Sequence, residues 1–208
     1  MTDAAIPLTG TDGRRLQARG QRTRQKLLDA AEQVFAALGY HDASIVKITE
    51  AAGVSQGTFY LYFAGKKDVF DELLRELNRR VRRAMSEAAA EGATRVEQEI
   101  GGFHAFFRFT AEHPALYRII RQAEFVSPEM LQYHYDRLVD GYVLALRGAM
   151  ERGEIADADP EVLAWALMGV GELIGMRYIL WAGRSDVPEE VLSEIERIVR
   201  AVLSPGSA

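Results

Sequence analysis

Apolar residues recur every three or four positions along most of this chain, which is the period of an α-helix with one buried face. The first such pattern extends from about residue 22 to residue 38 and ends at Gly39, a residue type that commonly terminates helices. Its apolar stripe consists of Leu27, Leu28, Ala31, Val34, Phe35 and Leu38. This pattern predicts one amphipathic helix whose stripe faces a core.

Two short helices and a much longer one are predicted next. Gly53 separates the helix that Ser44 is placed to cap from the helix that Ser55 is placed to cap. The second short helix is expected to reach about Phe63, and a long helix is expected over residues 66–90.

Regular helix signals continue to the end of the chain. Thr94 and Glu97 have the spacing of a capping box, in which two side chains satisfy backbone N–H groups at a helix start. Proline, which the first turn of a helix tolerates, occurs where four further helices would begin, at Pro114, Pro128, Pro160 and Pro188. No segment sustains the period-two alternation of a half-buried strand. The prediction is an all-α protein of about nine helices.

The composition limits the chemistry that the chain can carry. Its 208 residues are 48% hydrophobic and 26% charged, which is typical of a folded protein. There is no cysteine, so disulfides, thiolate metal sites and cysteine nucleophiles are excluded. No stretch has the about 18 uninterrupted apolar residues of a spanning helix, and the N-terminus lacks the pattern of a secretory signal. We expect a soluble, cytoplasmic protein with no membrane partner.

Charge is divided unevenly along the chain. The net charge is −5, yet residues 14–67 hold nine basic and four acidic residues, whereas residues 68–208 hold sixteen basic and twenty-four acidic ones. Because salt screens charges beyond about 8–10 Å, the local charge decides what a surface attracts. The side chains expected to attract phosphates are Arg14, Arg15, Arg19, Arg22, Arg24, Lys47, Lys66 and Lys67.

The two short helices and the tight turn at Gly53-Val54 form a helix-turn-helix pattern. On the second helix Phe59 and Phe63 are four positions apart and are expected to face the core. The outer side is left with Gln56, Gly57, Thr58, Tyr60 and Tyr62. Glutamine pairs with base edges, threonine offers a hydroxyl and a methyl group, and tyrosine bonds phosphates, so this face suits a major groove. For either tyrosine alone, ordinary amphipathic packing with a solvated hydroxyl is the simpler interpretation.

Residues 23–70 resemble the DNA-binding domain of the TetR (TetR/AcrR) family of transcriptional regulators. The resemblance covers about a quarter of the chain and rests on residues that match in order at fixed spacing. They are Phe35-Ala36-x-x-Gly39-Tyr40, Ile48-x-x-x-Ala52-Gly53-Val54-Ser55, and Gly57-Thr58-Phe59-Tyr60-x-Tyr62-Phe63 followed by Lys66. The resemblance implies an all-helical homodimer with an N-terminal three-helix DNA-binding domain and a larger C-terminal helical ligand domain.

The resemblance also implies a domain division and a set of DNA contacts. We expect a flexible arm over residues 1–18, the helix-turn-helix domain over residues 19–66, and a ligand-binding and dimerisation domain over residues 67–208. The residues expected at the DNA are Ser44, Lys47, Ser55, Gln56, Gly57, Thr58, Tyr60, Tyr62 and Lys66. Thr49 and Leu61 depart from the family pattern, in which a small alanine and a polar or basic residue are usual.

Residues 94–208 carry many bulky apolar side chains but no motif. Such side chains build a helix-bundle core and a ligand pocket alike, so composition does not separate the two. The candidate ligand contacts are Phe103, Phe107, Tyr117, Arg121, Glu124, Trp165, Met168 and Arg177. Arg118 and Arg121, three positions apart, suit either a phosphate-bearing ligand such as an acyl-CoA or a solvated surface pair.

The last two helices are expected to form a homodimer. Small residues at Ala164, Gly171 and Gly175 let the helix within residues 159–183 pack closely against another helix. Together with the last helix, this segment resembles the pair through which family members dimerise as a four-helix bundle. Packing of the same small residues within one protomer is the alternative.

No catalytic pattern accompanies the helix-turn-helix. The four histidines are scattered, and neither a nucleophile elbow nor a phosphate-binding glycine loop is present, so we expect no enzymatic activity, no metal and no cofactor. The predicted function is a ligand-responsive, sequence-specific transcriptional regulator. It is expected to be a repressor that an apolar small molecule, such as an acyl-CoA, releases from a palindromic double-stranded operator. The alternative is a helical binding protein or an activator whose helix-turn-helix no ligand controls.

Overall fold

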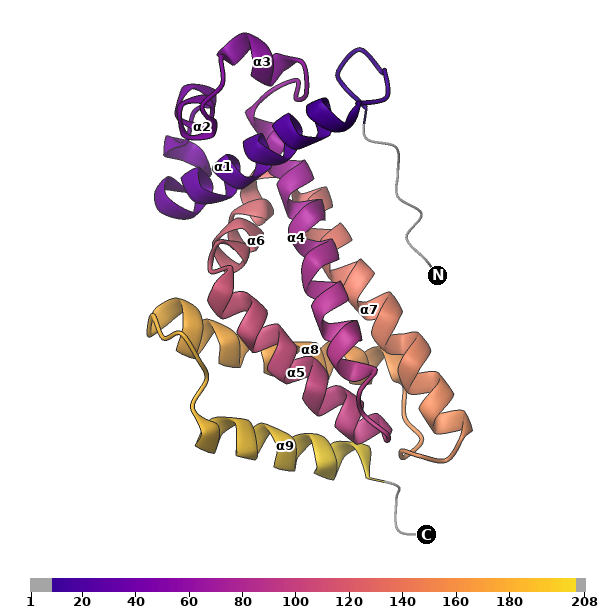
Figure 1. The fold of residues 1–208 in the computed structure, drawn as a ribbon. Helices are drawn as coiled ribbons and strands as arrows, with labels where there is room; N and C mark the ends of the chain where they lie inside the picture. Colours follow the sequence, from indigo (N-terminus) through magenta and orange to yellow (C-terminus); the bar gives the residue numbers. More distant parts are fainter. Residues whose placement is uncertain (1–8, 205–208) are drawn as a thin grey trace. The chain divides into compact units, whose positions relative to one another are not determined.

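The computed structural model describes residues 9–204, a range that contains nine α-helices and one π-helical turn. In chain order the elements are α1 (Ala18–Asp42), α2 (Ile45–Ala52), α3 (Gln56–Tyr60), α4 (Lys66–Ala89), α5 (Arg95–Glu112), α6 (Ala115–Val126), α7 (Pro128–Glu151), α8 (Pro160–Gly175), η1 (Met176–Trp181) and α9 (Glu189–Leu203) (Figure 1). Within residues 9–204 the only β-type pairing is an isolated bridge between Thr9 and Arg15. The prediction of an all-α protein of about nine helices is confirmed.

The helix ends differ from the predicted ones at three places. α1 begins at Ala18, about four residues before the expected start. Gly39 interrupts α1 as predicted, with a φ of 74° and a ψ of 171°, but one further turn follows it. α3 ends at Tyr60, three residues short of the expected Phe63, because the chain must turn there before α4 begins.

The predicted capping side chains are in place. Ser44 Oγ and Ser55 Oγ each accept a hydrogen bond of 3.2 Å from the backbone N–H three residues later. Thr94 and Glu97 form the reciprocal bonds of a capping box. These bonds satisfy N–H groups that the start of a helix leaves without a partner, which is why the helices begin at these residues.

The chain divides into two compact units. The first contains the residues up to Glu76 together with Arg118–Met130, and the second contains Leu77–Tyr117 and the residues from Leu131 onward. Helices α4, α6 and α7 therefore contribute residues to both units. Residues 67–76 and 118–130 therefore belong to the same compact unit as the helix-turn-helix. The functional division at residues 66 and 67 stays a prediction.

The core of the first unit is aromatic. Phe35, Phe59, Phe63 and Phe70 are each at most 1% exposed. The rings of Phe35 and Phe70 meet edge to face with centroids 5.4 Å apart, and those of Phe59 and Phe63 lie 5.6 Å apart. Burying one such ring stabilises the fold by about 2 kcal/mol, so these contacts hold one side of α3 against the core. The prediction that Phe59 and Phe63 face the core is confirmed.

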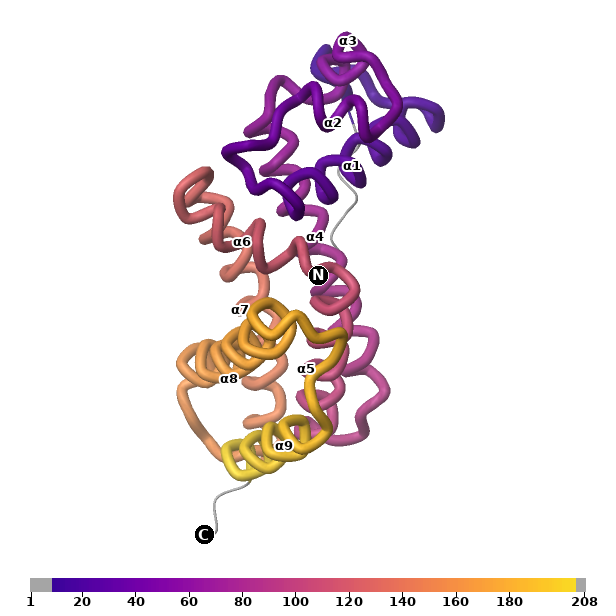
Figure 2. The backbone as a smooth tube through the Cα atoms, turned by 90° about the vertical axis from the view of Figure 1, so that its left-hand side faces the viewer, coloured from indigo at the N-terminus to yellow at the C-terminus, as the bar shows by residue number. Residues whose placement is uncertain are grey.

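In the second unit, α8 and α9 both pack on α5 (Figure 2). Two glycines of α8 lie too close to their neighbours for a larger residue. A Cβ added at Gly171 would lie 3.0 Å from Phe103 Cε1, and one added at Gly175 would clash with Tyr117 Oη. Ala164 is fully buried as well. The small residues of α8 therefore pack within the protomer, which is the alternative considered above.

Pro160–Trp181 is the one segment of residues 9–204 with the length and apolar composition of a membrane-spanning helix, and its most apolar window has a mean hydropathy of 1.4. The helices of a soluble core often have the same composition. Five residues of α8 are buried in this unit, namely Leu163, Ala164, Leu167, Gly171 and Gly175. The α8 part of this segment is therefore a core helix of the second unit.

Candidate nucleic-acid interface

The side of α3 that faces away from Phe59 presents polar groups to solvent. Gln56 and Gly57 are exposed, and Tyr60 is 49% exposed. Thr58 is half-buried, because its Oγ1 lies 3.0 Å from Ser55 Oγ within the helix cap. The predicted outer face is therefore exposed at three of these positions, while Ser55 and Thr58 also cap the helix.

Gly57 has no neighbour that requires a glycine. A Cβ added there would meet only Ser55 Oγ, at 3.8 Å, which is an ordinary contact distance. The backbone at Gly57 is helical, so its conformation does not require glycine either. The contacts within the described chain thus leave room for a larger side chain at Gly57.

Ser44 and Lys47 lie at the start of α2. Ser44 is half-buried and serves as the cap, and Lys47 is exposed. The ammonium of Lys47 donates one hydrogen bond, of 3.0 Å, to the backbone carbonyl of Asp42. An ammonium has three donors, so this one bond leaves Lys47 able to contact a phosphate.

Tyr62 and Leu61 follow α3. Tyr62 is half-buried, and its hydroxyl lies 3.6 Å from the position that a Cβ would take at Gly20 of α1. Leu61 is 61% exposed, although it stands where the resemblance would place a polar or basic residue. Tyr62 therefore contacts α1 with part of its side chain, in contrast to Tyr60.

Lys66 does not lie as the resemblance implied. Its ammonium donates three hydrogen bonds to backbone carbonyls, at 2.7 Å to Tyr40, 3.2 Å to His41 and 2.9 Å to Ala43. It also lies 4.4 Å from the centroid of the Tyr40 ring. All three donors of the ammonium are used, because the last turn of α1 leaves carbonyls without helical partners. Lys66 thus holds the end of α1 in this arrangement, and its phosphate contact stays a prediction.

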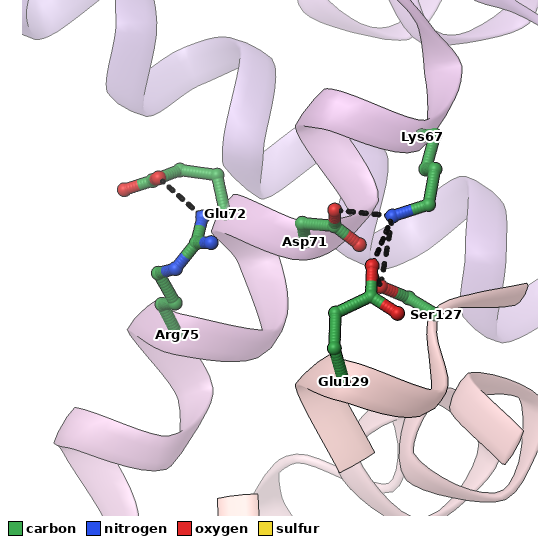
Figure 3. A network of polar contacts seen from close by, with 6 residues as sticks. All are labelled: Lys67, Asp71, Glu72, Arg75, Ser127 and Glu129. Atoms are coloured by element: carbon green, nitrogen blue, oxygen red, sulfur yellow. Dashed lines mark hydrogen bonds and ion pairs between the residues drawn. The ribbon is translucent and has the colours of Figure 1, made fainter. Parts of the chain in front are cut away.

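Lys67 is engaged in the same way. Figure 3 shows its ammonium donating to Asp71 at 2.7 Å, Ser127 at 2.9 Å and Glu129 at 2.8 Å. Hydrogen bonding to the two carboxylates raises the pKa of Lys67, and the same ammonium lowers the pKa of Glu129 to about 2. Lys67 therefore ties α4 to the start of α7 within the first unit and has no free donor for DNA.

Arg24 is also occupied inside the first unit. It is buried, its guanidinium lies 2.8 Å from the carboxylate of Glu72, and it stacks 5.2 Å from the centroid of Phe63. A buried guanidinium paired in this way stabilises the contact of α1 with α4 rather than attracting phosphates. Of the eight basic residues expected to do so, six are exposed, namely Arg14, Arg15, Arg19, Arg22, Lys47 and Lys67, and the Lys67 ammonium is already bound as described above.

Two side chains of α6 hold the end of α1, a role that the sequence did not reveal. The Gln122 side-chain oxygen accepts a hydrogen bond from the Tyr40 N–H, and the Arg118 guanidinium donates one to the Ala36 carbonyl. Both bonds join residues 82 positions apart, so no local pattern indicates them. They place residues 118–122 with the helix-turn-helix, and they give Arg118 a structural partner instead of a phosphate-bearing ligand.

The segment before α1 also contacts the helix-turn-helix. The Thr11 hydroxyl donates to the Tyr60 carbonyl at 2.9 Å, and the Thr11 N–H donates to the Leu61 carbonyl at 3.0 Å. Ala18, which we had placed in the flexible arm, already belongs to α1. Hydrogen bonds thus hold part of residues 9–17, and the flexible arm stays a prediction. Residues 1–8 of the predicted arm lie outside the described residues.

The eight candidate ligand contacts are divided between the two units. Phe103, Phe107 and Tyr117 are buried in the second unit, where burial raises the pKa of the Tyr117 hydroxyl. Arg121 and Glu124 are exposed on the part of α6 that belongs to the first unit. These two residues are therefore not part of the apolar cluster that the three aromatic residues form.

The other three candidates lie in the second unit. Trp165 is 44% exposed, and its ring centroid lies 5.7 Å from that of Tyr135. Met168 is half-buried against the core cluster. Arg177 is exposed, with its guanidinium 5.5 Å from the ring centroid of Tyr178. Only Met168 among these three packs against the apolar cluster.

Polar groups inside the second unit form two hydrogen-bonded sets. The Tyr135 hydroxyl lies 2.7 and 2.8 Å from the two carboxylate oxygens of Glu172. Asn78 donates to Nδ1 and to the carbonyl of the buried His134, each at 3.0 Å, and accepts from Arg82 Nε at 2.9 Å. Burial, together with the nearby charge of Arg82, lowers the pKa of His134 to about 4. The sequence shows that Glu172 and His134 are polar, but it does not show which residues they pair with.

Residues 9–204 contain no group of three or more histidine, aspartate or glutamate side chains placed to hold a metal ion. The polar residues that do cluster, such as Lys67 with Asp71 and Glu129, satisfy one another in ion pairs. Within residues 9–204 the geometry offers an exposed helix, α3, with a polar face.

Comparison with known proteins agrees with this geometry. The family model described as "Bacterial regulatory proteins, tetR family" matches residues 27–73, which span the helix-turn-helix. A helix-turn-helix transcriptional regulator of Bacillus subtilis, the uncharacterised YdgC, is 26% identical over 92% of this chain and 98% of its own length. The fatty acid metabolism regulator protein of the same organism is 32% identical over 62% of this chain and 66% of its own length.

A solved structure shares the fold over nearly the whole chain. The transcriptional regulator FadR from Bacillus subtilis, determined in complex with stearoyl-CoA, superposes with a TM-score of 0.73 and 22% identity. The alignment covers 88% of this chain and 99% of that one. The relatives are transcriptional regulators and not enzymes, and the similarity extends to both units of the chain.

Proposed function

This chain belongs to the TetR family of bacterial transcriptional regulators, and from that premise we propose that it is a homodimeric repressor which a small apolar effector releases from a palindromic operator. The observation that carries the proposal is the exposed polar side of α3. Phe59 holds the helix against the core, while Gln56, Gly57 and Tyr60 face solvent. An exposed glutamine on a helix of this kind reads a base edge in the major groove.

The outward faces of α8 and α9 support the dimer. Large apolar side chains on these helices are exposed in the single chain: Val162 by 66%, Leu173 by 62%, Ile198 by 42% and Val202 by 48%. Exposed apolar side chains gathered on one helix pair mark a contact surface, and a two-fold dimer matches a palindromic operator. Two α3 helices would then enter successive major grooves about 34–36 Å apart.

The similarity to fatty acid regulators supports an acyl-CoA effector. One such relative is 32% identical, and the FadR structure of the same fold contains stearoyl-CoA. The second unit has an interior that suits an acyl chain, because Phe103, Phe107 and Met168 belong to or pack against its apolar cluster. Helices α4, α6 and α7 are shared by both units, so an effector in the second unit acts on the first through them.

The first test is binding to operator DNA. Duplexes selected from the genome with the wild-type protein are titrated with Gln56→Ala and Tyr60→Ala, and each variant is expected to bind about 5- to 100-fold more weakly. Gln132→Ala, which removes an exposed glutamine from α7, is the matched control and should bind like the wild type. Equal affinity of all four proteins would refute the assignment of α3 as the reading helix.

The second test concerns the effector. Adding stearoyl-CoA to the operator complex is expected to weaken binding by about 5- to 150-fold, which is the usual range of coupling between two ligands of one protein. Operator binding that stearoyl-CoA and shorter acyl-CoA esters leave unchanged would exclude this effector class. Binding of RNA polymerase promoted by the protein at the same operator would indicate an activator, the remaining alternative. A cytoplasmic location follows from this function, since the operator lies there.

A further inference from the structure

Residues 9–17 form a closed loop on the carboxyl end of α3. Figure 1 shows this loop, in indigo, at the start of α1 and beside the segment that follows α3. Within the loop, the Gly10 N–H donates to the Arg14 carbonyl at 2.9 Å, and Thr9 pairs with Arg15 in a β-bridge. The Arg14 N–H donates to the Asp12 carboxylate at 3.0 Å. The loop is thus held by its own backbone.

The loop completes α3. The last carbonyls of a helix lack helical partners. At the end of α3 the carbonyls of Thr58 and Phe59 accept hydrogen bonds from the residues that follow, whereas those of Tyr60 and Leu61 accept the two bonds from Thr11. Thr11 therefore acts as a cap supplied from 49 residues away.

Two glycines make this contact fit. A Cβ added at Gly10 would lie 3.0 Å from the Leu61 carbonyl oxygen and 3.1 Å from Asp12 Oδ1, which is tighter than normal contact. Gly13 has a φ of +75°, a conformation that favours glycine. The sequence Gly10-Thr11-Asp12-Gly13 is accordingly suited to this turn, and docking on α3 accounts for glycine at its first position.

Within the two short helices of the helix-turn-helix, α2 has one cation, Lys47, and α3 has none. No lysine or arginine occurs between Ile48 and Gly65, which includes all of α3, and Glu50 is the one charged residue there. Three nearby cations already bind groups within the first unit, namely Lys66, Lys67 and Arg24. A protein that binds duplex DNA must still neutralise phosphates next to its reading helix.

The docked loop supplies those cations. Arg14 and Arg15 are both exposed, and the Arg14 side chain is 89% exposed. The Asp12 carboxylate lies 3.6 Å from Arg14 Nε and offsets the positive charge of Arg14 only weakly. Resting on our proposal that α3 reads DNA, we propose that residues 9–16 form a second DNA-contacting element, in which Thr11 docks the loop on α3 and Arg14 and Arg15 bind phosphates that flank the α3 site. The loop takes the place of the basic residue that Leu61 does not provide.

The test measures operator affinity as a function of salt. The variant Arg14→Ala/Arg15→Ala is compared with wild type and with Arg108→Ala/Arg147→Ala, which removes two exposed arginines from the second unit. The arm variant should bind about 10- to 100-fold more weakly. Its slope of log affinity against log salt should be shallower by about 4, because the dimer loses four phosphate contacts and each contributes about 0.9. Arg14→Lys/Arg15→Lys should retain the wild-type slope.

Docking is tested separately by Thr11→Val, which removes the hydroxyl and leaves both arginines. It should weaken binding several-fold with an unchanged melting temperature of the free protein. If wild type binds the operator but the arm variant keeps its affinity and slope, the arm proposal is overturned and the function of α3 stands. If Thr11→Val binds the operator with wild-type affinity, the proposal that docking of the loop on α3 positions Arg14 and Arg15 is overturned. If wild-type protein binds no duplex at all, it is the proposed function that fails.

Discussion

Lys66 is the first residue of α4 and follows the helix-turn-helix closely in the chain. A lysine beside a helix-turn-helix suggests a phosphate contact, yet the Lys66 ammonium bonds three carbonyls at the end of α1. Such a cation replaces partners that the helix end lacks, so its contribution belongs to the stability of the first unit. Position along the chain does not distinguish the two roles, because both need a cation at the same place.

Replacing Lys66 with methionine is therefore expected to destabilise the protein. Lys66→Met leaves three carbonyls without their donor while keeping most of the side-chain volume, and the free energy of unfolding should fall by about 2 kcal/mol. Lys47→Met, which removes a single bond at an exposed position, should lower it by less than about 0.5 kcal/mol. Urea denaturation of both variants checks this difference. Equal effects would show that the three carbonyl bonds add nothing.

His134 gives the second unit a dependence on pH. Its pKa is about 4 in the folded protein, against about 6.5 for an unfolded histidine. Between these values the unfolded chain takes up a proton that the folded chain does not, since Nδ1 of His134 must remain an acceptor for Asn78. Stability from this group is therefore complete above about pH 6.5 and falls as the pH drops toward 4.

The loss should reach about 2 kcal/mol at pH 5, because each unit of pH below 6.5 costs about 1.4 kcal/mol. His134→Gln removes the titration, so its free energy of unfolding should decline less than that of the wild type between pH 7.5 and pH 5. Denaturation curves for both proteins at the two pH values provide the comparison. If the free energy of unfolding falls equally in wild type and variant, His134 is not held neutral in the folded protein.

At the scale of the elements, α8 shows two uses of glycine. Gly175 approaches the Tyr117 hydroxyl, whereas a Cβ at Gly169 would meet no atom within 4 Å. Gly175→Ala should lower the free energy of unfolding by about 2–3 kcal/mol, since the ring of Tyr117 must move. Gly169→Ala should raise it by about 0.5–1 kcal/mol, because alanine loses less entropy in a helix. Thermal unfolding separates the two.

A further change tests the cause of the Gly175 effect. Tyr117→Phe removes the hydroxyl oxygen that an added Cβ would strike, so combining it with Gly175→Ala should restore part of the lost stability. If the effects of the two substitutions on the free energy of unfolding simply add, the loss caused by Gly175→Ala comes from a contact other than the Tyr117 hydroxyl. The π-helical turn η1 follows Gly175 directly.

At the scale of the whole molecule, the outward apolar residues of α8 and α9 are expected to hold two chains together. Leu173→Glu/Val202→Glu places charges on side chains that are 62% and 48% exposed in one chain, so the fold of the protomer should persist. The dimer should dissociate, and affinity for a full palindrome should fall more than 100-fold, while a single half-site should bind as weakly as before.

Sedimentation and operator titration together check that prediction. Arg108→Glu/Arg147→Glu, at exposed positions of α5 and α7, serves as a charge-changing control that should remain a dimer. A double variant of α8 and α9 that still sediments as a dimer would place the interface elsewhere on the molecule.

Local sequence determined the helices of this protein and the direction in which α3 faces. Ser44, Ser55, Thr94 and Gly53 act on backbone groups within a few residues, so their effects appear in the sequence directly. Phe59 and Phe63 likewise identify the buried side of α3, because a helix repeats every 3.6 residues.

Tertiary structure alone decided which polar groups remain free. The bonds of Lys66 to α1, of Gln122 to Tyr40 and of Thr11 to the end of α3 join residues 23 to 82 positions apart, so no local pattern encodes them. Charge in a sequence shows what a side chain is able to bind. The folded structure determines whether the hydrogen-bond donors of that side chain are already bound to carbonyls and carboxylates of the protein. A donor used within the protein is not available to DNA.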